Sequence, residues 1–245
     1  MTWEYLATIP IVLGTLAQRI TGLGFALLAA PVFVLFFGPD AGVLLVNLCG
    51  IAASGVGVAI DWRRIEWGRL ALLTPAAVGG VLSGTVIGTV LARPLLEITV
   101  GVVLLAGLAS LIIRRRPSRA ASRRGTFAAG GTAGLAGALA GLPGPPIALY
   151  AGATGWKGPS MSATLQVLFF TTSTTAFAVK IVSGVATLPS LDIGLWVAIV
   201  IALTMGLSIG HVLGPRIPPT WPWRILLVIA VAGALATIAH GFLSL

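Results

Sequence analysis

The chain has 245 residues, of which 57% are hydrophobic and only 9% are charged, and its mean hydropathy is +1.05. A soluble domain carries about 25% charged residues, so this composition excludes a water-soluble globular protein and indicates an integral membrane protein. The net charge of +9 is then expected at the membrane edges, where Lys and Arg gather, and a nucleic-acid partner is not expected.

Apolar stretches of about the 20 residues that a helix needs to cross a bilayer follow one another along the chain. They predict an all-α protein with about eight transmembrane helices, in two homologous four-helix halves at residues 1–113 and 126–245, joined by a basic loop at 114–125. The expected spans, in chain order, are 3–37, 42–60, 68–92, 95–113, 126–155, 159–182, 190–214 and 221–243. The first residues, Met-Thr-Trp-Glu, lack a basic region, so no cleaved signal peptide is expected.

The first stretch of each half is longer than one span and contains a cluster that interrupts a helix. The clusters are Gly22-Leu23-Gly24 and Gly141-Leu142-Pro143-Gly144-Pro145-Pro146. Each predicts a broken helix or a helix with a re-entrant piece. Such breaks survive in lipid where they face protein or water, and free amides at a helix N-terminus bind anions. Gly22, Gly24, Gly141 and Gly144 are therefore candidate substrate-binding residues, with close helix packing as the alternative.

Polar residues recur at the same positions of the two halves. Asn47 and Gln166 lie 119 residues apart, as do Ser54 and Ser173 and the two glycines that open the breaks. We expect these four polar side chains to line a substrate site between the halves, most of all Asn47 and Gln166. Hydrogen bonding between helices is the alternative. A second pair of motifs, GTVIG at 84–88 and GLSIG at 206–210, has the G-x-x-x-G spacing of close helix packing.

Arg19 lies about midway along the first apolar stretch, just before the break. A guanidinium beside free backbone amides would bind a sulfonate or sulfite oxygen cluster through paired hydrogen bonds. The alternative is an arginine that extends to the membrane surface. Lys180 occupies the position of Asp61 in the repeat, where a role at the interface is favoured over a gate that attracts anions.

Basic residues predict the orientation of the chain. Arg63, Arg64 and Arg69 occupy one loop and six arginines crowd 114–124, whereas the opposite side receives only Arg93, Lys157, Arg216 and Arg224. Because an excess of Lys and Arg marks the cytoplasmic face, both termini and the Arg-rich central loop are expected in the cytoplasm. Four spans in each half also predict parallel repeats, related by an axis along the membrane normal.

Residues 22–31, Gly-Leu-Gly-Phe-Ala-Leu-Leu-Ala-Ala-Pro, and residues 141–146 follow a pattern of Gly-rich turn, apolar run and Pro. With these motifs, the chain resembles the sulfite exporter TauE/SafE family over nearly its full length. Phe25, Ala26 and Pro143 stand where further glycines are common in the family, which affects the expected substrate more than the fold. The resemblance implies export of sulfite or organosulfonates such as sulfoacetate across the cytoplasmic (inner) membrane.

The expected function is secondary transport of a small anion by alternating access, and a passive anion channel or a permease for another small anion is the alternative. The chain has no Walker A motif, nucleophile elbow or metal-ligand spacing, so we expect no enzyme, cofactor or metal. The expected partners are the anionic substrate and the lipid bilayer. A coupling ion, H⁺ or Na⁺, and a homodimer are left open.

Overall fold

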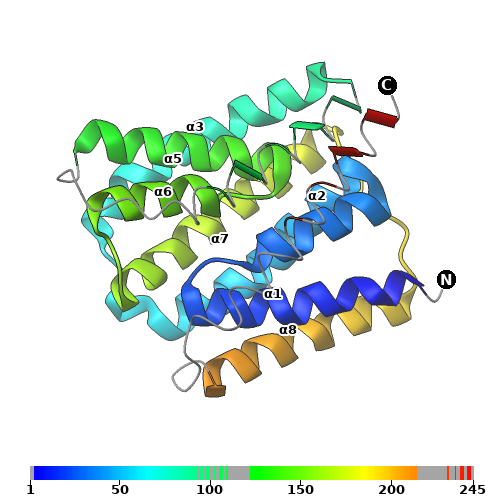
Figure 1. Cartoon of the computed structure of the whole chain (residues 1–245), viewed down its shortest axis with the longest axis horizontal. Coiled ribbons are helices and arrows are strands. Elements are labelled where there is room, and N and C mark those ends of the chain that lie inside the picture. The colour runs from blue at the N-terminus through cyan, green and yellow to red at the C-terminus, as the bar shows by residue number, and fades with distance from the viewer. Residues whose placement is uncertain are drawn as a thin grey trace.

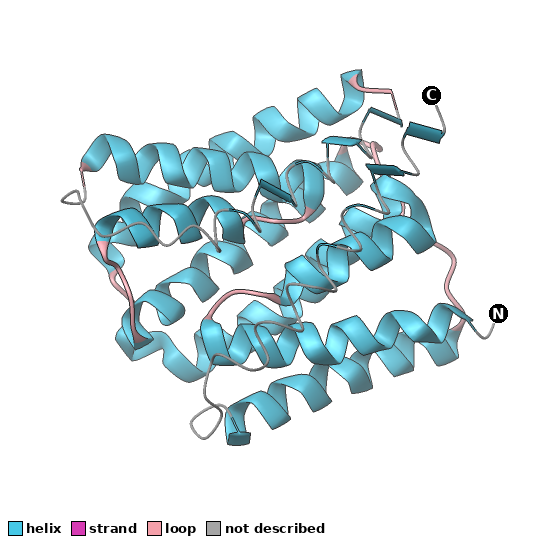
Figure 2. Ribbon diagram, viewed as in Figure 1, coloured by secondary structure: helices cyan, strands magenta, loops and turns pink. Residues whose placement is uncertain are grey.

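The computed structural model describes residues 3–92 and 122–213, together with scattered residues between 94 and 109 and between 231 and 243. The described part consists of helices joined by short turns (Figures 1 and 2). The elements are η1 (Trp3–Ala7), α1 (Thr8–Thr21), α2 (Phe25–Asp61), η2 (Trp62–Arg64), α3 (Trp67–Val90), α5 (Arg123–Ala140), α6 (Gly144–Thr154), α7 (Pro159–Val182) and α8 (Ile193–Leu213).

Four segments of the described part are long and apolar enough to cross a membrane: Phe25–Arg64, Trp67–Val90, Pro159–Val182 and Ile193–Leu213. These confirm the prediction of an all-α, multi-pass membrane protein. The last three lie close to the predicted spans 68–92, 159–182 and 190–214. The predicted spans 95–113 and 221–243 fall mostly outside the described residues, and the count of eight spans stays a prediction.

Helix α1 ends at Gly22, whose left-handed backbone (φ 79°) points its N–H at the carbonyl of Gln18. The chain then folds back along α1. The start of α2 packs against the middle of α1, since a methyl group added at Gly14 would lie 2.9 Å from the carbonyl oxygen of Phe25. The 14 residues of α1 span about 21 Å, less than the roughly 30 Å of hydrocarbon in a bilayer. Segment 3–37 therefore forms a helical hairpin, with its tip at residues 22–24, rather than one broken span.

Helices α5 and α6 form the corresponding hairpin in the second half. Gly141 ends α5 in the same left-handed conformation (φ 70°), and α6 starts at Gly144. At the other end of the pair, the hydroxyl groups of Thr126 and Tyr150 lie 2.8 Å apart. The chain therefore folds back along α5, with a tip at residues 141–143.

A further glycine reverses the chain after each hairpin. Gly38 interrupts α2 with φ 79° and ψ 170°, and Gly158 precedes α7 with φ 94° and ψ −173°. Each is followed by a proline, Pro39 or Pro159. A positive φ of this kind suits glycine, which lacks a Cβ, and the proline can occupy the first helical position. Long helices, residues 39–61 and α7, begin at these points.

The long helices 39–61 and α7 run antiparallel. A methyl group at Gly50 would meet Ser173, whereas one at Gly57 would meet Gln166. Residue numbers therefore increase along one helix in the direction in which they decrease along the other. The 119-residue spacing aligns these two helices with each other, and parallel repeats would make them parallel. The prediction of parallel repeats is therefore wrong. Each hairpin returns the chain toward the end from which it started, whereas the span count took segments 3–37 and 126–155 as one crossing each.

The N-terminal residues lie at the end of the molecule opposite to the arginine-rich turns. The Tyr5 hydroxyl donates a hydrogen bond of 3.4 Å to Asp192 at the start of α8. At the other end of α1, Arg19 pairs with Asp61, next to Arg63 and Arg64. The prediction that the N-terminus shares a side with these arginines is wrong, for the same reason. Figure 1 shows α1 and α8 running side by side.

Glycines let α3 and α5 approach closely, with their backbones in contact along most of their length (Figure 1). A methyl group at Gly134 would strike the carbonyl of Ala77, and one at Gly80 would strike the carbonyl of Gly131. The GTVIG and GLSIG motifs pack in the same way, with Gly84 against Ala138 and Gly206 against Val12. Membrane helices often associate through small residues that allow close backbone packing. The hydrophobic effect cannot drive this association, because lipid tails are as apolar as the side chains.

Two adjacent glycines test this packing. We expect Gly80→Ala to lower the free energy of unfolding by about 1–3 kcal/mol, the usual effect of overpacking. Gly79→Ala is the matched control, because a methyl group there meets no atom within 4 Å and alanine favours a helix. Thermal unfolding of the purified protein in detergent would show a lower melting temperature for Gly80→Ala alone. Equal effects of the two changes would contradict the packing.

A carboxylate ties the start of α3 to the start of α7. Glu66 accepts hydrogen bonds from the Trp156 indole (2.8 Å) and the Ser160 hydroxyl (2.7 Å), and Arg69 lies 3.4 Å from its second oxygen. Partial burial raises the pKa of Glu66, but the hydrogen bonds from Ser160 and Trp156 and the charge of Arg69 outweigh it and hold the pKa below its ordinary value. The ionised carboxylate therefore stabilises this end of the fold.

We expect Glu66→Gln to lower the free energy of unfolding by about 1–2 kcal/mol at pH 7, because hydrogen bonds to a charged group are stronger than neutral ones. A lowered folded-state pKa stabilises the protein above the unfolded-state pKa, about 4.3 for Glu, and that stability is lost as the pH falls through the folded-state pKa. The difference between wild type and Glu66→Gln should therefore vanish in acid. Thermal melts at several pH values measure it.

Trp156→Phe removes the indole donor and keeps an aromatic ring. Because both changes remove one shared hydrogen bond, the double variant should lose less than the sum of the single losses. Additive losses, or a difference that persists in acid, would show that Glu66 does not act through this contact.

Candidate functional site

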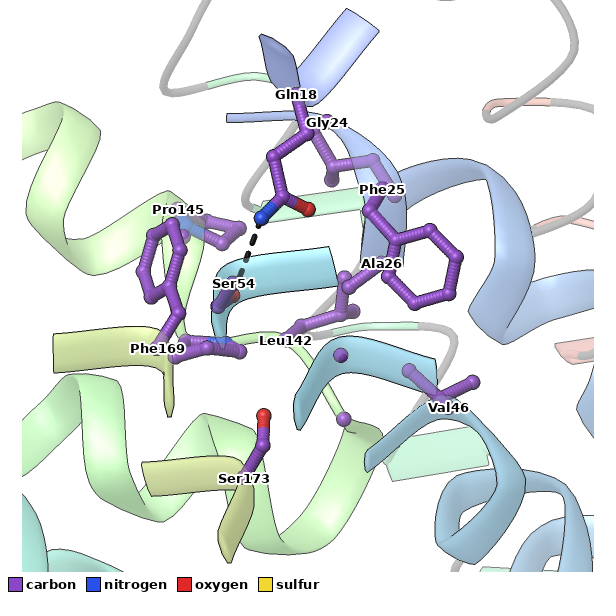
Figure 3. A pocket seen from close by; sticks show the side chains of 15 residues that line it. Gln18, Gly24, Phe25, Ala26, Val46, Ser54, Leu142, Pro145, Phe169 and Ser173 are labelled. Carbon is purple, nitrogen blue, oxygen red and sulfur yellow. Dashed lines mark hydrogen bonds between the residues drawn. The ribbon is translucent and has the colours of Figure 1, made fainter. Parts of the chain in front are cut away.

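The two hairpin tips meet at a pocket between α2 and α7, here called the central pocket. It is lined by Gly24, Phe25 and Ala26 from the first break and by Gly141, Leu142 and Gly144 from the second. Leu23 lies against the second tip, because a methyl group at Gly144 would be 3.3 Å from its side chain. The pocket has a volume of about 30 Å³, room for two or three waters at about 10–15 Å³ each. Figure 3 shows the side chains that surround it.

The start of α2 gives the central pocket an electropositive end. The first four N–H groups of a helix have no partner within it, and no side chain caps this N-terminus at Gly24. Gly24, Phe25, Ala26 and Leu27 all line the pocket. The helix dipole adds partial positive charge at the same place. This arrangement suits the oxygen atoms of an anion.

Helix α6 contributes fewer donors. It also starts at the pocket, but Pro145 occupies its first turn together with Pro146, and proline has no N–H. The ring of Pro145 and the Phe169 side chain face the pocket from this side (Figure 3). The central pocket is therefore donor-rich at the α2 break and apolar at the α6 break.

A chain of buried amides and hydroxyls borders the pocket. The side-chain amide of Gln18 donates hydrogen bonds to the Ser54 hydroxyl (3.1 Å) and to the Gln166 carbonyl oxygen (2.9 Å). Ser54, Ser173 and Gln18 line the pocket, and Figure 3 shows the Gln18 amide pointing at Ser54. The sequence analysis missed Gln18. A polar side chain within an apolar stretch, one residue before Arg19, was the available signal.

A much larger cavity of about 950 Å³ opens on the other side of the first hairpin tip. We call it the basic cavity, because it is lined by Arg19, Arg63, Arg64, Lys157 and His211, with one carboxylate, Asp61. Leu23 lines the basic cavity and Gly24 lines the central pocket. The tip at 22–24 therefore separates the two spaces. The prediction that Lys157 lies opposite Arg63 and Arg64 is wrong.

Arg19 lies in the basic cavity and not in the central pocket. Its guanidinium is 2.6 Å from the Asp61 carboxylate and 3.3 Å from the His211 ring. Asp61 also lies 3.4 Å from Arg64. These contacts tie the end of α1 to the ends of α2 and α8. The structure thus places Arg19 on the approach to the pocket, because its side chain extends away from the break toward a carboxylate.

Of the nine residues that the sequence suggested for the site, five line the central pocket: Gly24, Ser54, Gly141, Gly144 and Ser173. Besides Arg19, three others do not. Gly22 faces Ser162. The Asn47 amide donates a hydrogen bond to the carbonyl of Val43, one helical turn back, and the Gln166 side-chain oxygen accepts a hydrogen bond from Gln18. The serine pair, ranked below the amide pair, thus lies closer to the pocket, because each amide finds an internal partner.

Comparison with known proteins agrees with this architecture. Residues 7–238 match the family Sulfite exporter TauE/SafE. A relative from Cupriavidus necator (strain ATCC 17699 / H16), named "Probable sulfite/organosulfonate exporter TauE", is 29% identical over 216 residues, which cover 84% of this chain and 80% of the relative. No solved structure matches. Because the family match covers nearly the whole chain, this protein belongs to the sulfite exporter TauE/SafE family.

Proposed function

We propose that this protein is a secondary transporter that exports small sulfur-containing anions, sulfite or organosulfonates, by alternating access. One observation carries the proposal: two breaks from opposite halves converge on one pocket inside the helix bundle. Exposed backbone at membrane depth is tolerated where it lines a protein-enclosed or wet cavity, and discontinuous helices form the substrate sites of many transporters. The family and the name of the Cupriavidus relative supply the substrate class.

The two halves, 1–113 and 126–245, are in our proposal inverted repeats related by an axis in the membrane plane. Support comes from paired features of the described residues. In both hairpins the first helix ends at a left-handed glycine, Gly22 or Gly141. Helix α1 packs on α8, and α5 packs on α3. Because α5 corresponds to α1 and α3 corresponds to α8 in the repeat, these two contacts are equivalent. The antiparallel pair formed by 39–61 and α7 lies between them.

The basic cavity is the entrance from the cytoplasm. Arg63, Arg64, Arg69, Arg123 and Arg124 gather at this end of the bundle, and arginine-rich turns mark the cytoplasmic side. A cavity with positively charged walls raises the local concentration of anions. In this orientation residues 3–7 lie on the opposite, outer side of the membrane.

The anion binds in the central pocket with its oxygen atoms at the N-terminus of α2. Backbone amides of this turn and the hydroxyl groups of Ser54 and Ser173 donate to it. Val46, Leu142 and Phe169 also line the pocket and contact the carbon chain of an organosulfonate. One positive end and one apolar end fit a molecule with a single acid group.

The closed pocket favours a carrier over a channel. An enclosed space of about 30 Å³ is too small for an ion of four or more heavy atoms, so the tips must move apart to admit it. The tip at 22–24 opens toward the basic cavity, and the tip at 141–143 opens the other way. A negative interior drives the anion outward with about 2.3 kcal/mol per charge per 100 mV. The described residues give no argument for a coupling ion or a homodimer.

Counterflow in proteoliposomes tests the function. Vesicles loaded with unlabelled sulfite should accumulate ³⁵S-sulfite through the purified protein, because a carrier exchanges one anion for another. A thermal-shift panel of sulfite, sulfoacetate, taurine, thiosulfate and sulfate ranks the substrates. A channel would show uptake without acceleration by internal anion. Absence of uptake and of any thermal shift would contradict the proposal.

A matched pair of substitutions tests the binding site. Ala26→Asp places a carboxylate at the amides of α2, where it takes the position of the anion and repels it. Ala26→Asn has nearly the same size and no charge. We expect Ala26→Asp to lose the sulfite-induced thermal shift and to exchange sulfite at least about tenfold more slowly than Ala26→Asn, equivalent to about 1.4 kcal/mol.

Ala26→Asp should also melt at a higher temperature than Ala26→Asn without ligand, because an acid stabilises a helix N-terminus. Equal sulfite binding by the two variants would place the anion elsewhere.

A further inference from the structure

A lysine is buried at the end of the bundle opposite to the basic cavity. The Lys180 side chain, near the end of α7, is only 7% exposed and lines a small cavity of about 20 Å³ together with Asp40, Thr85 and Ala138. Asp40, just after the Gly38 kink, is the carboxylate whose field acts on the ammonium group. We call this space the Lys180 cavity. The prediction that Lys180 extends to the interface does not agree with its burial.

The Lys180 cavity is the counterpart of the basic cavity in the repeat register. Lys180 corresponds to Asp61, Ala138 to Arg19, and Gly84 and Gly88 to Gly206 and Gly210. Asp61, Arg19 and Gly210 line the basic cavity, whereas Lys180, Ala138, Gly84 and Gly88 line the Lys180 cavity. The two corresponding spaces thus have volumes of about 950 Å³ and about 20 Å³, one wide and one narrow.

Both cavities also stand in the same relation to the central pocket. Arg19 precedes the tip at 22–24, and Ala138 precedes the tip at 141–143. Each tip lines the central pocket. Leu23 of the first tip also lines the basic cavity, and Ala138 and Leu139, just before the second tip, line the Lys180 cavity. An anion that leaves the central pocket past the second tip therefore enters the space at Lys180.

From this geometry we infer a second binding site for the transported anion at Lys180, which forms on the outer half of the path when the Lys180 cavity opens. This inference rests on the proposed function. In this structure Asp40 lines the same cavity as Lys180, and its carboxylate is the charge that acts on the ammonium group. In the open state the sulfite or sulfonate oxygen atoms replace the carboxylate, because an ammonium group has three donors and binds such oxygens as a point charge.

The exchange of partners links opening to the presence of an anion. Separation of Asp40 from Lys180 without a replacement leaves a buried charge unpaired, which is strongly unfavourable. An arriving anion removes that penalty. The outer side therefore opens readily when the anion is present and stays closed when it is absent, so the protein does not leak.

Three variants separate this role from a purely structural ion pair: Lys180→Met, Asp40→Asn and the neutral double variant Asp40→Asn/Lys180→Met. A structural pair is broken equally by either single change, and the double variant, which leaves no unpaired charge, restores function. A binding role requires the cation alone. We then expect Asp40→Asn to exchange sulfite within about threefold of wild type, and both variants without the lysine to lose about tenfold or more.

Sulfite-induced thermal shifts in detergent serve as the second measurement, because they report the central pocket. Lys180→Met should keep the wild-type shift while exchange in proteoliposomes falls. If Lys180→Met does not purify as a monodisperse protein, the double variant and Lys180→Gln provide the same comparison.

Wild-type exchange by Lys180→Met, or recovery of exchange in the double variant, would overturn the inference and leave the proposed function intact. Absence of sulfite exchange by the wild-type protein, with no thermal shift, would instead overturn the proposed function and the inference with it.

Discussion

Backbone amides that leave a helix inside a membrane need a partner, because lipid offers none. The rest of this structure depends on how that constraint is met at residues 22–24 and 141–143. Left-handed glycines return N–H groups to the preceding carbonyls of α1 and α5. The N-terminal residues of α2 and α6 then line a shared pocket. The same feature that lets the fold exist in a membrane therefore forms the pocket in which we propose that the anion binds.

Charged residues divide the molecule into two unequal ends. Arg19 and Asp61 border a wide cavity, and their repeat counterparts Ala138 and Lys180 border a closed one. Arg19 pairs with Asp61, and Asp40 lines the same cavity as Lys180. In the proposed inverted-repeat frame, different side chains at the two ends would give the anion a preferred entrance and a gated exit. The central pocket is asymmetric as well, with a helix N-terminus at the α2 break and prolines at the α6 break.

Local chemistry made part of this architecture predictable. Gly22 and Gly141 end α1 and α5 in the left-handed conformation, and Pro143 lies between α5 and α6, so both breaks lie where the sequence places them. The proline at 159 likewise marks the start of α7. Direction could not be read in the same way, because segment 3–37 has the composition of one span and the structure of two antiparallel arms. One missed reversal in each half changes the side of the N-terminus and the relation between the halves.

The contacts of long polar side chains were the other feature that could not be predicted from the sequence. Arg19 reaches Asp61, 42 residues along the chain, and Gln18 reaches Gln166, which is 148 residues away. No local pattern selects such partners. Short side chains stay near their own backbone, which is why Ser54 and Ser173 line the pocket while Asn47 turns back to Val43.

The most direct measurement of the central claim is the position of a bound anion. Crystals grown with 2-bromoethanesulfonate allow the bromine to be located by anomalous diffraction, with the sulfonate in the density beside it. The account predicts the sulfonate at the N-terminus of α2, between Ala26, Ser54 and Ser173, with the bromine toward Phe169. A sulfonate held by Arg19 and Arg63 in the basic cavity, with the central pocket unchanged, would contradict it.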